Sequence, residues 1–454
     1  MAGNRMGTEP VGHLLLTMSV PMVLASLASS LYNVVDSMFV GMLGETALTA
    51  ISLATPAATI MLGVYFGMSI GVNVVISSAL GAGDRQRAGH AAGNGFLLVG
   101  ICYLLFATFG IWGIDAFYAV QTSDLEVTAL GVGYSRILLV GSFGLAVQTL
   151  VERLLSSTGK TVLAMVVLAG GAVLNIALDP ILMFGLLGAP ALGMEGAAIA
   201  TVVSQCAAGA VGLFLNTRRN PEVRVIGASF KPDAGLLGKT ASIGLPNVIT
   251  YSFTSLIIFG MNQVLLAFST AAPAVYVIFV RVNNLIRLPV FGIRNTLVPI
   301  AAYNRGAGLH GRVRRAVRLS LAWGTAVMVV GAALFELFPA QMLSAFSATP
   351  EMLAIGVPAL RIVGASILVS GVTVVLGGVF QAMDESWKAM AVAVVQTASL
   401  MGAAVALGQL GDLNLVWCAF VASELVIAAL SVALYMPTRK RLLEGGTGGD
   451  GRRS

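Results

Sequence analysis

Long apolar segments alternate with short polar segments along almost the whole chain. Most of these segments have about 20 apolar residues or more, which is the length an α-helix needs to cross a bilayer. They are continuously apolar and do not alternate residue by residue, so they predict helices and not β-strands. We expect twelve membrane-spanning helices, at residues 14–40, 48–80, 90–112, 131–155, 161–187, 195–216, 238–266, 272–303, 315–337, 355–380, 387–409 and 413–436.

The composition agrees with an all-α integral membrane protein. Of the 454 residues, 57% are hydrophobic and 10% are charged, whereas soluble domains have about 45–50% apolar and about 25% charged residues. The three cysteines and three histidines are scattered without the spacing of a metal site. We therefore expect no metal cluster and no cofactor. Short loops disfavour an integral-membrane glycosyl or acyl transferase, so we expect no enzymatic activity.

The lysines and arginines predict the orientation. Twelve spans place both termini on one side, and that side holds most of the 26 basic residues, including those of the segments 217–239 and 304–315. Glu45 and Asp124 fall in the opposite loops. The positive-inside rule then predicts cytoplasmic termini in a multi-pass protein of the inner (plasma) membrane. This bias accounts for the net charge of +6, so no nucleic-acid partner is expected.

The second half of the chain matches the first half at one constant offset, without a gap. Six spans separate the two copies, so both have the same orientation, as in transporters built from parallel repeats. The matching positions are Pro21 with Pro246, Gly67 with Gly292, Gly81-Ala82-Gly83 with Gly306-Ala307-Gly308, and Ala164-Met165 with Ala389-Met390.

The repeat predicts two pseudo-symmetric six-helix bundles with a cleft between them. Rocking of the bundles would open the cleft alternately to each side of the membrane, which is the architecture of a secondary transporter. We expect a monomer in the lipid bilayer. The expected divisions are an N-lobe at 1–216, a cytoplasmic linker at 217–237, a C-lobe at 238–436 and a flexible cytoplasmic tail at 437–454.

Two acids lie inside apolar segments of the first repeat. A charge at the centre of a membrane helix costs about 2.5–3.5 kcal/mol on insertion scales, so each needs a reason. Asp36 shares a helical stripe with Pro21 and Tyr32, and Asp179 lies one turn after Asn175. Pro180 should leave the Ile176 carbonyl without its helical donor. The carboxylate, carboxamide, hydroxyl and free carbonyl oxygens of these residues are suitable ligands for a sodium ion. Two carboxylates that lie close together could instead share a proton.

The second repeat has no equivalent acids. Met261 matches Asp36, and Ala404 matches Asp179. Packing of the repeat therefore does not need these carboxylates, which favours an added function over a structural role.

Other intramembrane side chains have two open interpretations. Arg281, Arg287 and Arg294 recur on one face of the eighth span, where they could line the cleft or reach towards the interface and pair with Glu336. Soft and aromatic side chains could either pack the core or form a polyspecific pocket; those considered for the cleft are Met38, Tyr65, Met68 and Met261.

Several motifs resemble those of the MATE family of multidrug and toxic compound extrusion transporters, closest to its DinF-like branch. The resemblance covers nearly the whole chain. Its carriers are Ser19-Val20-Pro21, Leu31-Tyr32-Asn33-Val34-Val35-Asp36, Phe39-Val40-Gly41, Leu80-Gly81-Ala82-Gly83-Asp84, Leu174-Asn175-Ile176-Ala177-Leu178-Asp179-Pro180, Gly193-Met194-Glu195-Gly196-Ala197-Ala198-Ile199-Ala200-Thr201, Ile243-Gly244-Leu245-Pro246 and Asn304-Arg305-Gly306-Ala307.

The resemblance implies an exporter of bulky organic cations, driven by entry of protons or sodium ions. It assigns the ion site to Asp36, Asn175, Asp179 and Thr201, and bending of the first helix to Pro21. Some relatives place acids in spans 7 and 10, where this chain has none, so a second ion site is not expected there. The alternative function is a lipid or lipid-linked oligosaccharide flippase of the same superfamily.

Overall fold

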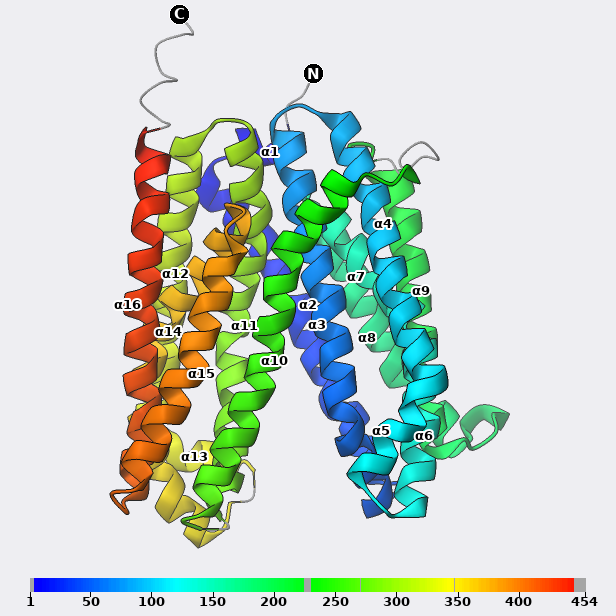
Figure 1. Cartoon of the computed structure of the whole chain (residues 1–454), viewed down its shortest axis with the longest axis vertical. Coiled ribbons are helices and arrows are strands. Elements are labelled where there is room, and N and C mark those ends of the chain that lie inside the picture. The colour runs from blue at the N-terminus through cyan, green and yellow to red at the C-terminus, as the bar shows by residue number, and fades with distance from the viewer. Residues whose placement is uncertain (1–3, 224–229, 270, 347, 445–454) are drawn as a thin grey trace, which may run out of the picture. The chain divides into compact units, whose positions relative to one another are not determined.

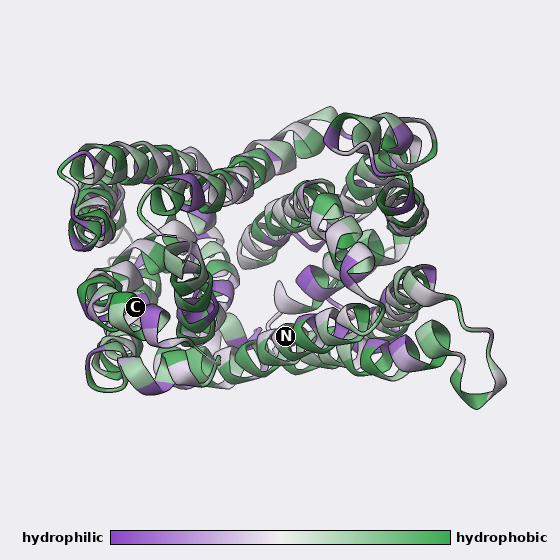
Figure 2. Cartoon of the chain, turned by 90° about the horizontal axis from the view of Figure 1, so that it is seen from below, coloured by the Kyte–Doolittle hydropathy of each residue, from purple (hydrophilic) through white to green (hydrophobic). Residues whose placement is uncertain are grey.

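The computed structural model describes residues 4–223, 230–269, 271–346 and 348–444, and regular structure in these ranges is helical throughout. Among the described residues, eleven helices are long and apolar enough to cross a membrane, and the number is twelve if one bent pair of helices counts as a single span. Hydrophobic residues predominate along most of the helices (Figure 2). The expected all-helical membrane fold is confirmed.

The N-terminal unit is built from Leu24–Val248 together with the chain end up to Arg5. Within it, α3, α4 and α7 pack against one another, and α8 packs beside α9 (Figure 1). Its elements are the second part of α2 (Val11–Gly41), α3 (Glu45–Gly81), α4 (Arg85–Thr108), the π-helix η1 (Phe109–Gly113), α5 (Ile114–Gln121), α6 (Leu125–Val140), α7 (Phe143–Ser156), α8 (Thr161–Phe184), the 3-10 helix η2 (Leu186–Gly188), α9 (Gly193–Arg219) and the first part of α10 (Ala234–Leu266).

The C-terminal unit is built from Ile249 onwards, together with Met6–Val23. In this unit, helix α14 packs against three helices, α11, α12 and α16, and α15 packs on α16. Besides α1 (Arg5–Thr8, in this unit from Met6 on), the first part of α2 and the second part of α10, its elements are α11 (Ala271–Gly306), α12 (His310–Leu337), α13 (Pro339–Ser344), α14 (Pro350–Ala382), α15 (Ser386–Gly408) and α16 (Leu413–Glu444).

The fourth span is broken, where the hydrophobic pattern predicts one helix at 131–155. Helices α6 and α7 meet at a bend of 44° around Gly141 and Ser142. The Ser142 hydroxyl donates to the Leu139 carbonyl over 2.7 Å and lies 2.9 Å from the Tyr65 hydroxyl. A side chain thus occupies the interrupted backbone ladder, which is a recognised cause of helix bending.

Helices α2 and α10 each divide between the two units, at positions related by the repeat. The divisions follow Val23 and Val248, which are equivalent positions of the two copies. Glycines allow each helix to approach its neighbour closely. In the N-terminal unit a Cβ on Gly67 would lie 2.8 Å from the Gly244 carbonyl oxygen, and in the C-terminal unit the matching Gly292 lies against Val23. The structure therefore repeats the same close helix contact in both units.

Gly71→Ala should destabilise the N-terminal unit. A Cβ at this position would overlap the backbone carbonyl of Thr240, and backbone atoms cannot rotate away. We expect a loss of about 1–3 kcal/mol, typical of overpacking, seen as a lower thermal unfolding midpoint in detergent. Gly100→Ala is the control, because nothing lies within 4 Å of a Cβ there; an equal loss in both variants would contradict the close contact.

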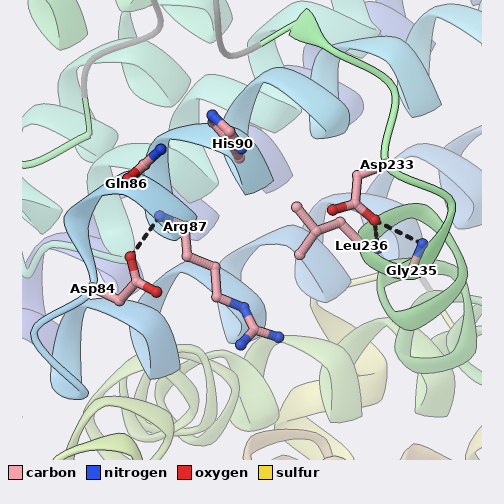
Figure 3. A pocket seen from close by; sticks show the side chains of 7 residues that line it. All are labelled: Asp84, Gln86, Arg87, His90, Asp233, Gly235 and Leu236. Atoms are coloured by element: carbon pink, nitrogen blue, oxygen red, sulfur yellow. Dashed lines mark hydrogen bonds between the residues drawn. The ribbon is translucent and has the colours of Figure 1, made fainter.

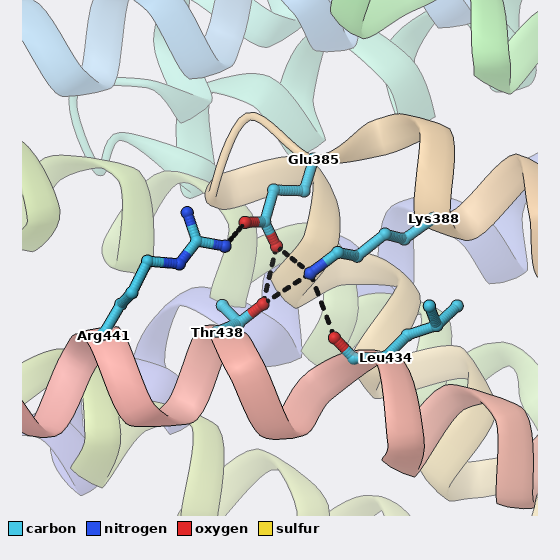
Figure 4. Close-up of polar contacts among 5 residues, drawn as sticks. All are labelled: Glu385, Lys388, Leu434, Thr438 and Arg441. Carbon is cyan, nitrogen blue, oxygen red and sulfur yellow. Dashed lines mark hydrogen bonds and ion pairs between the residues drawn. The ribbon is translucent and has the colours of Figure 1, made fainter.

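A buried ion cluster holds the end of α16 against the start of α15. Glu385 lies 2.7 Å from the Lys388 ammonium, accepts a hydrogen bond from Thr438 over 2.6 Å, and pairs with Arg441 (Figure 4). Lys388 also donates to the Leu434 carbonyl over 3.0 Å. These contacts fix the turns on both sides of Pro437, so α16 continues to Glu444 where the composition predicts a flexible tail from 437. Residues 445–454 lie outside the described ranges.

Burial alone would raise the pKa of Glu385, but the hydrogen bonds from Lys388 and Thr438 and the nearby positive charges lower it. A lowered pKa in the folded state stabilises the fold above the ordinary glutamate pKa of about 4.3. This contribution is lost as the pH falls through the lowered value.

Glu385→Gln should therefore reduce stability at pH 7, by about 1–3 kcal/mol for the loss of charge-assisted hydrogen bonds. Thermal unfolding of both proteins between pH 7 and pH 3 should show the gap closing below about pH 4. Glu336→Gln is the matched control, because its pair with Arg361 at 3.8 Å is more than half exposed and such pairs contribute little. A gap that stays constant with pH would contradict the assigned role of the Glu385 charge.

Candidate functional site

Three of the predicted site residues are joined by hydrogen bonds inside the N-terminal unit. Asn175 and Asp179 lie one turn apart on α8, and Thr201 lies on the neighbouring α9. The Asn175 amide donates to Asp179 Oδ1 over 3.2 Å and to the Thr201 hydroxyl over 3.3 Å. Asp179 is fully buried, and Asn175 and Thr201 are nearly so. The carboxamide thus positions a carboxylate and a hydroxyl on two adjacent helices.

Helix α2 contributes Asp36 and Tyr32 to the same group of residues. Asp36 interacts electrostatically with Asp179, and the Tyr32 hydroxyl interacts with Thr201 and with both carboxylates. The two α2 residues are one helical turn apart, so they present adjacent groups to α8 and α9. The structure therefore gathers the four predicted ion-site residues and Tyr32 into one cluster, here called the carboxylate cluster.

Three acceptor oxygens of this cluster have no hydrogen-bond partner among the described protein groups. They are Asp36 Oδ1, Asn175 Oδ1 and Asp179 Oδ2. Buried acceptors without a donor cost about 1–3 kcal/mol each, and more when charged. A proton shared by the carboxylates, or a cation bound by all three oxygens, would remove that cost. The donor set of carboxylate, carboxamide and hydroxyl oxygens fits a hard cation such as sodium.

One protein family model matches the chain twice. This model, MatE, matches residues 21–181 and 246–406, so the two matches begin and end at equivalent positions of the repeat. Together they cover more than half of the chain. The chain belongs to the MATE family.

Relatives and solved structures agree with this membership. Multidrug export protein MepA of Staphylococcus aureus is 25% identical over 438 residues, with 94% of each chain covered; its Staphylococcus saprophyticus counterpart is 23% identical, with 92% of each covered. The fold matches an outward-facing multidrug resistance MATE transporter of the MOP superfamily at a TM-score of 0.91, over 98% of this chain and 99% of the other. A MOP superfamily transporter from Pyrococcus furiosus matches at 0.90, over the same shares; both are 22% identical to this chain.

Tyr134 is a member of the carboxylate cluster that the sequence did not single out in this MATE chain. It lies on α6, is 7% exposed, and interacts with Asp36, Asp179 and Tyr32. A tyrosine in an apolar span looks like ordinary packing. Only the fold shows that it lies within electrostatic range of the two carboxylates.

The residues predicted to line a cleft lie in different environments. Met38 on α2 is 65% exposed, whereas Tyr65, Met68 and Met261 are buried. Tyr65 is held by Ser142, and Met68 lies against Gly244. These three pack helices together in this structure and do not join the carboxylate cluster.

Pro21 and the arginines of the eighth span also lie outside the carboxylate cluster. Pro21 is inside the continuous helix α2, two residues before this helix passes from one unit to the other. Glu336, considered as an arginine partner, lies 3.8 Å from Arg361. Arg294 lies against Gly378, and Arg287 lines a separate cavity in the C-terminal unit.

A hollow of about 410 Å³ lies where α4 and α10 begin, lined by Asp84, Arg87, His90 and Asp233 among others (Figure 3). Both acids are used locally. Asp84 accepts from the Arg87 backbone amide over 2.8 Å, and Asp233 accepts from the backbone amides of Gly235 and Leu236 over 2.8 and 3.0 Å. Their carboxylates cap the first turns of two helices. This structural role explains why both acids are present, so the hollow gives no evidence of a bound ligand.

Proposed function

We propose that this member of a multidrug efflux transporter family exports organic cations in exchange for protons or sodium ions. The observation that carries the proposal is the carboxylate cluster: two acids inside the helix bundle, coupled to each other, whose remaining buried oxygens have no partner within the described protein. An inward-moving ion and an outward-moving organic cation can both compensate this negative charge, though not at the same time.

The cycle follows from charge compensation. An ion that enters from outside compensates part of the negative charge of Asp36 and Asp179, and the attraction of the unit for a bound cation then falls. Pro21 lacks the backbone donor that would bond residue 17, which makes this turn of α2 easier to bend. We infer that bending follows ion binding and expels the substrate. Release of the ion to the cytoplasm restores the negative charge for the next substrate.

The stoichiometry of the exchange decides its driving force. One monovalent ion exchanged for one monovalent organic cation moves no net charge, so the concentration gradient of the ion alone drives export. Two ions per organic cation would move one net charge inward, and the membrane potential would then add about 2.3 kcal/mol per 100 mV. That energy sustains a substrate gradient of more than about tenfold, since about 1.4 kcal/mol corresponds to tenfold.

Asp36→Asn should abolish coupled export, because the amide neither titrates nor carries negative charge while it keeps the shape of the side chain. In proteoliposomes with an imposed proton or sodium gradient, efflux of a fluorescent lipophilic cation should fall to the leak rate of protein-free vesicles. Glu45→Gln is the control, because Glu45 is an exposed acid of the same unit, at the start of α3. Wild-type efflux from a folded Asp36→Asn protein would refute the proposal.

The two acids should act as a unit. If Asp36 and Asp179 hold one ion between them, Asp179→Asn alone removes the site, and the double variant should be no worse than either single variant. Coupled efflux rates of the three variants provide the test. Losses that multiply in the double variant would show that the two acids serve independent steps.

A flippase remains the second candidate. Absence of gradient-driven cation efflux, together with movement of a labelled phospholipid or lipid-linked sugar between leaflets, would replace export by flipping.

A further inference from the structure

A cavity of about 220 Å³ lies inside the C-terminal unit, lined by residues of α10, α11, α14, α15 and α16. One part of its wall is aromatic, formed by Tyr276, Phe279 and Phe420, and another is polar, with Ser366 and Ser370 on α14. Drug-sized pockets measure about 300–1,000 Å³. This cavity suits one ring with short substituents, or one end of a larger compound.

Glu424 and Arg287 are the charged groups among the described residues that line the cavity. Glu424 is 8% exposed, in the apolar middle of α16, and interacts electrostatically with Arg287 on α11. The described structure nevertheless contains no direct ion pair within 4.0 Å between them. Glu424 Oε1, Arg287 Nε and the nearby Asn283 Oδ1 each lack a hydrogen-bond partner among the described protein groups. The two charges thus face one cavity without neutralising each other by contact.

The repeat argues against a structural need for the arginine. Arg287 lies within the matched repeat and corresponds to Leu62 of the first copy. The N-terminal copy therefore has an aliphatic side chain at the position of Arg287.

Charge balance decides which ligand the cavity can hold. Glu424 and Arg287 sum to zero, so a cation bound at Glu424 leaves the arginine uncompensated, and an anion bound at Arg287 leaves the glutamate uncompensated. Uncompensated charge away from water is costly. A ligand that carries both an ammonium and a carboxylate satisfies both groups and adds no net charge.

We propose that this cavity binds a zwitterion that carries an aromatic ring, with its ammonium at Glu424 and its carboxylate at Arg287. The ring packs against Tyr276, Phe279 and Phe420, where an aromatic face also attracts the ammonium. The site gives the protein a second substrate class, distinct from the organic cations of the carboxylate cluster. Binding itself does not depend on the proposed transport; only export of the zwitterion rests on that function.

Trp417 provides a reporter inside the protein. It is buried and stacks on the cavity-lining Phe420, with ring centroids 6.1 Å apart and planes 20° from parallel. Replacing the other three tryptophans (Trp112, Trp323 and Trp387) with phenylalanine leaves Trp417 as the single indole. A ligand beside Phe420 should change its emission.

The full-length single-tryptophan protein in detergent is titrated with three probes. All three carry a phenyl ring, and they differ in which charged groups are present. L-phenylalanine carries both charges, phenethylamine lacks the carboxylate, and 3-phenylpropanoate lacks the ammonium. We expect a saturable change of Trp417 emission with L-phenylalanine and at least tenfold weaker binding of the other two. Equal binding of phenethylamine would overturn the proposal in favour of a cation site, and no response to any probe would show that the cavity holds water only.

Variants of Glu424 and Arg287 test whether L-phenylalanine binds at these two charged side chains. Glu424→Gln and Arg287→Gln should each weaken L-phenylalanine binding at least tenfold, and Arg287→Lys should restore part of it. Arg281→Gln is the control, because Arg281 is exposed on the same helix and does not line the cavity. Unchanged affinity in the folded Glu424→Gln protein would overturn the assignment; if a variant does not fold, the probe series on the unaltered cavity still decides.

The result is separable from the proposed function. Zwitterion binding without cation export would refute antiport and leave this site standing. Cation export with no response of Trp417 would do the reverse.

Discussion

The cost of placing charge inside an apolar helix bundle governs this structure. An uncompensated charge is tolerated in a membrane span only where a partner, a proton or an ion balances it. Many charged side chains of the described residues avoid the problem by lying in loops or at helix ends, as Glu385 does with Lys388 and Arg441. Asp36 with Asp179, and Glu424 with Arg287, lie within spans and include buried polar atoms without a hydrogen-bond partner among the described protein groups. These two pairs are therefore where we propose that ligands bind.

The two repeats solve this constraint in different ways. The N-terminal copy gathers two acids with an amide and hydroxyls, which leaves negative charge for an ion or a cationic substrate. The C-terminal copy has Met261 and Ala404 at the matching positions, and instead holds one acid and one base around a cavity. The two copies share one helix framework, including the matching contacts of Gly67 and Gly292. We propose that the different charged side chains give each copy its own binding chemistry.

Sequence patterns predicted the helical class and the duplication, because these depend on span length and on a fixed offset. Spacing of one turn also singled out Asn175 with Asp179, whereas Thr201 followed from the family resemblance; the role of these residues as an ion site stays a prediction. The patterns could not predict that Tyr134 interacts electrostatically with Asp36 and Asp179, since this interaction depends on how helices far apart in the chain are placed in the fold. The bend at Ser142 and the ordered turn after Pro437 also depend on partners far away in the chain, namely Tyr65 and Glu385. Glu424 is different, because an acid in an apolar span is visible in the sequence, and its significance comes only from facing Arg287.

In the proposed cycle, substrate and ion compensate the same negative charge in turn. Such coupling is reciprocal, so a substrate gradient alone must drive the ion the other way. An organic-cation gradient imposed across proteoliposomes without any ion gradient tests this coupling, with internal pH followed by a trapped dye and sodium by a radioactive tracer. We expect opposite movement of one of the two ions, absent in Asp36→Asn; substrate movement without movement of either ion would refute the proposed exchange.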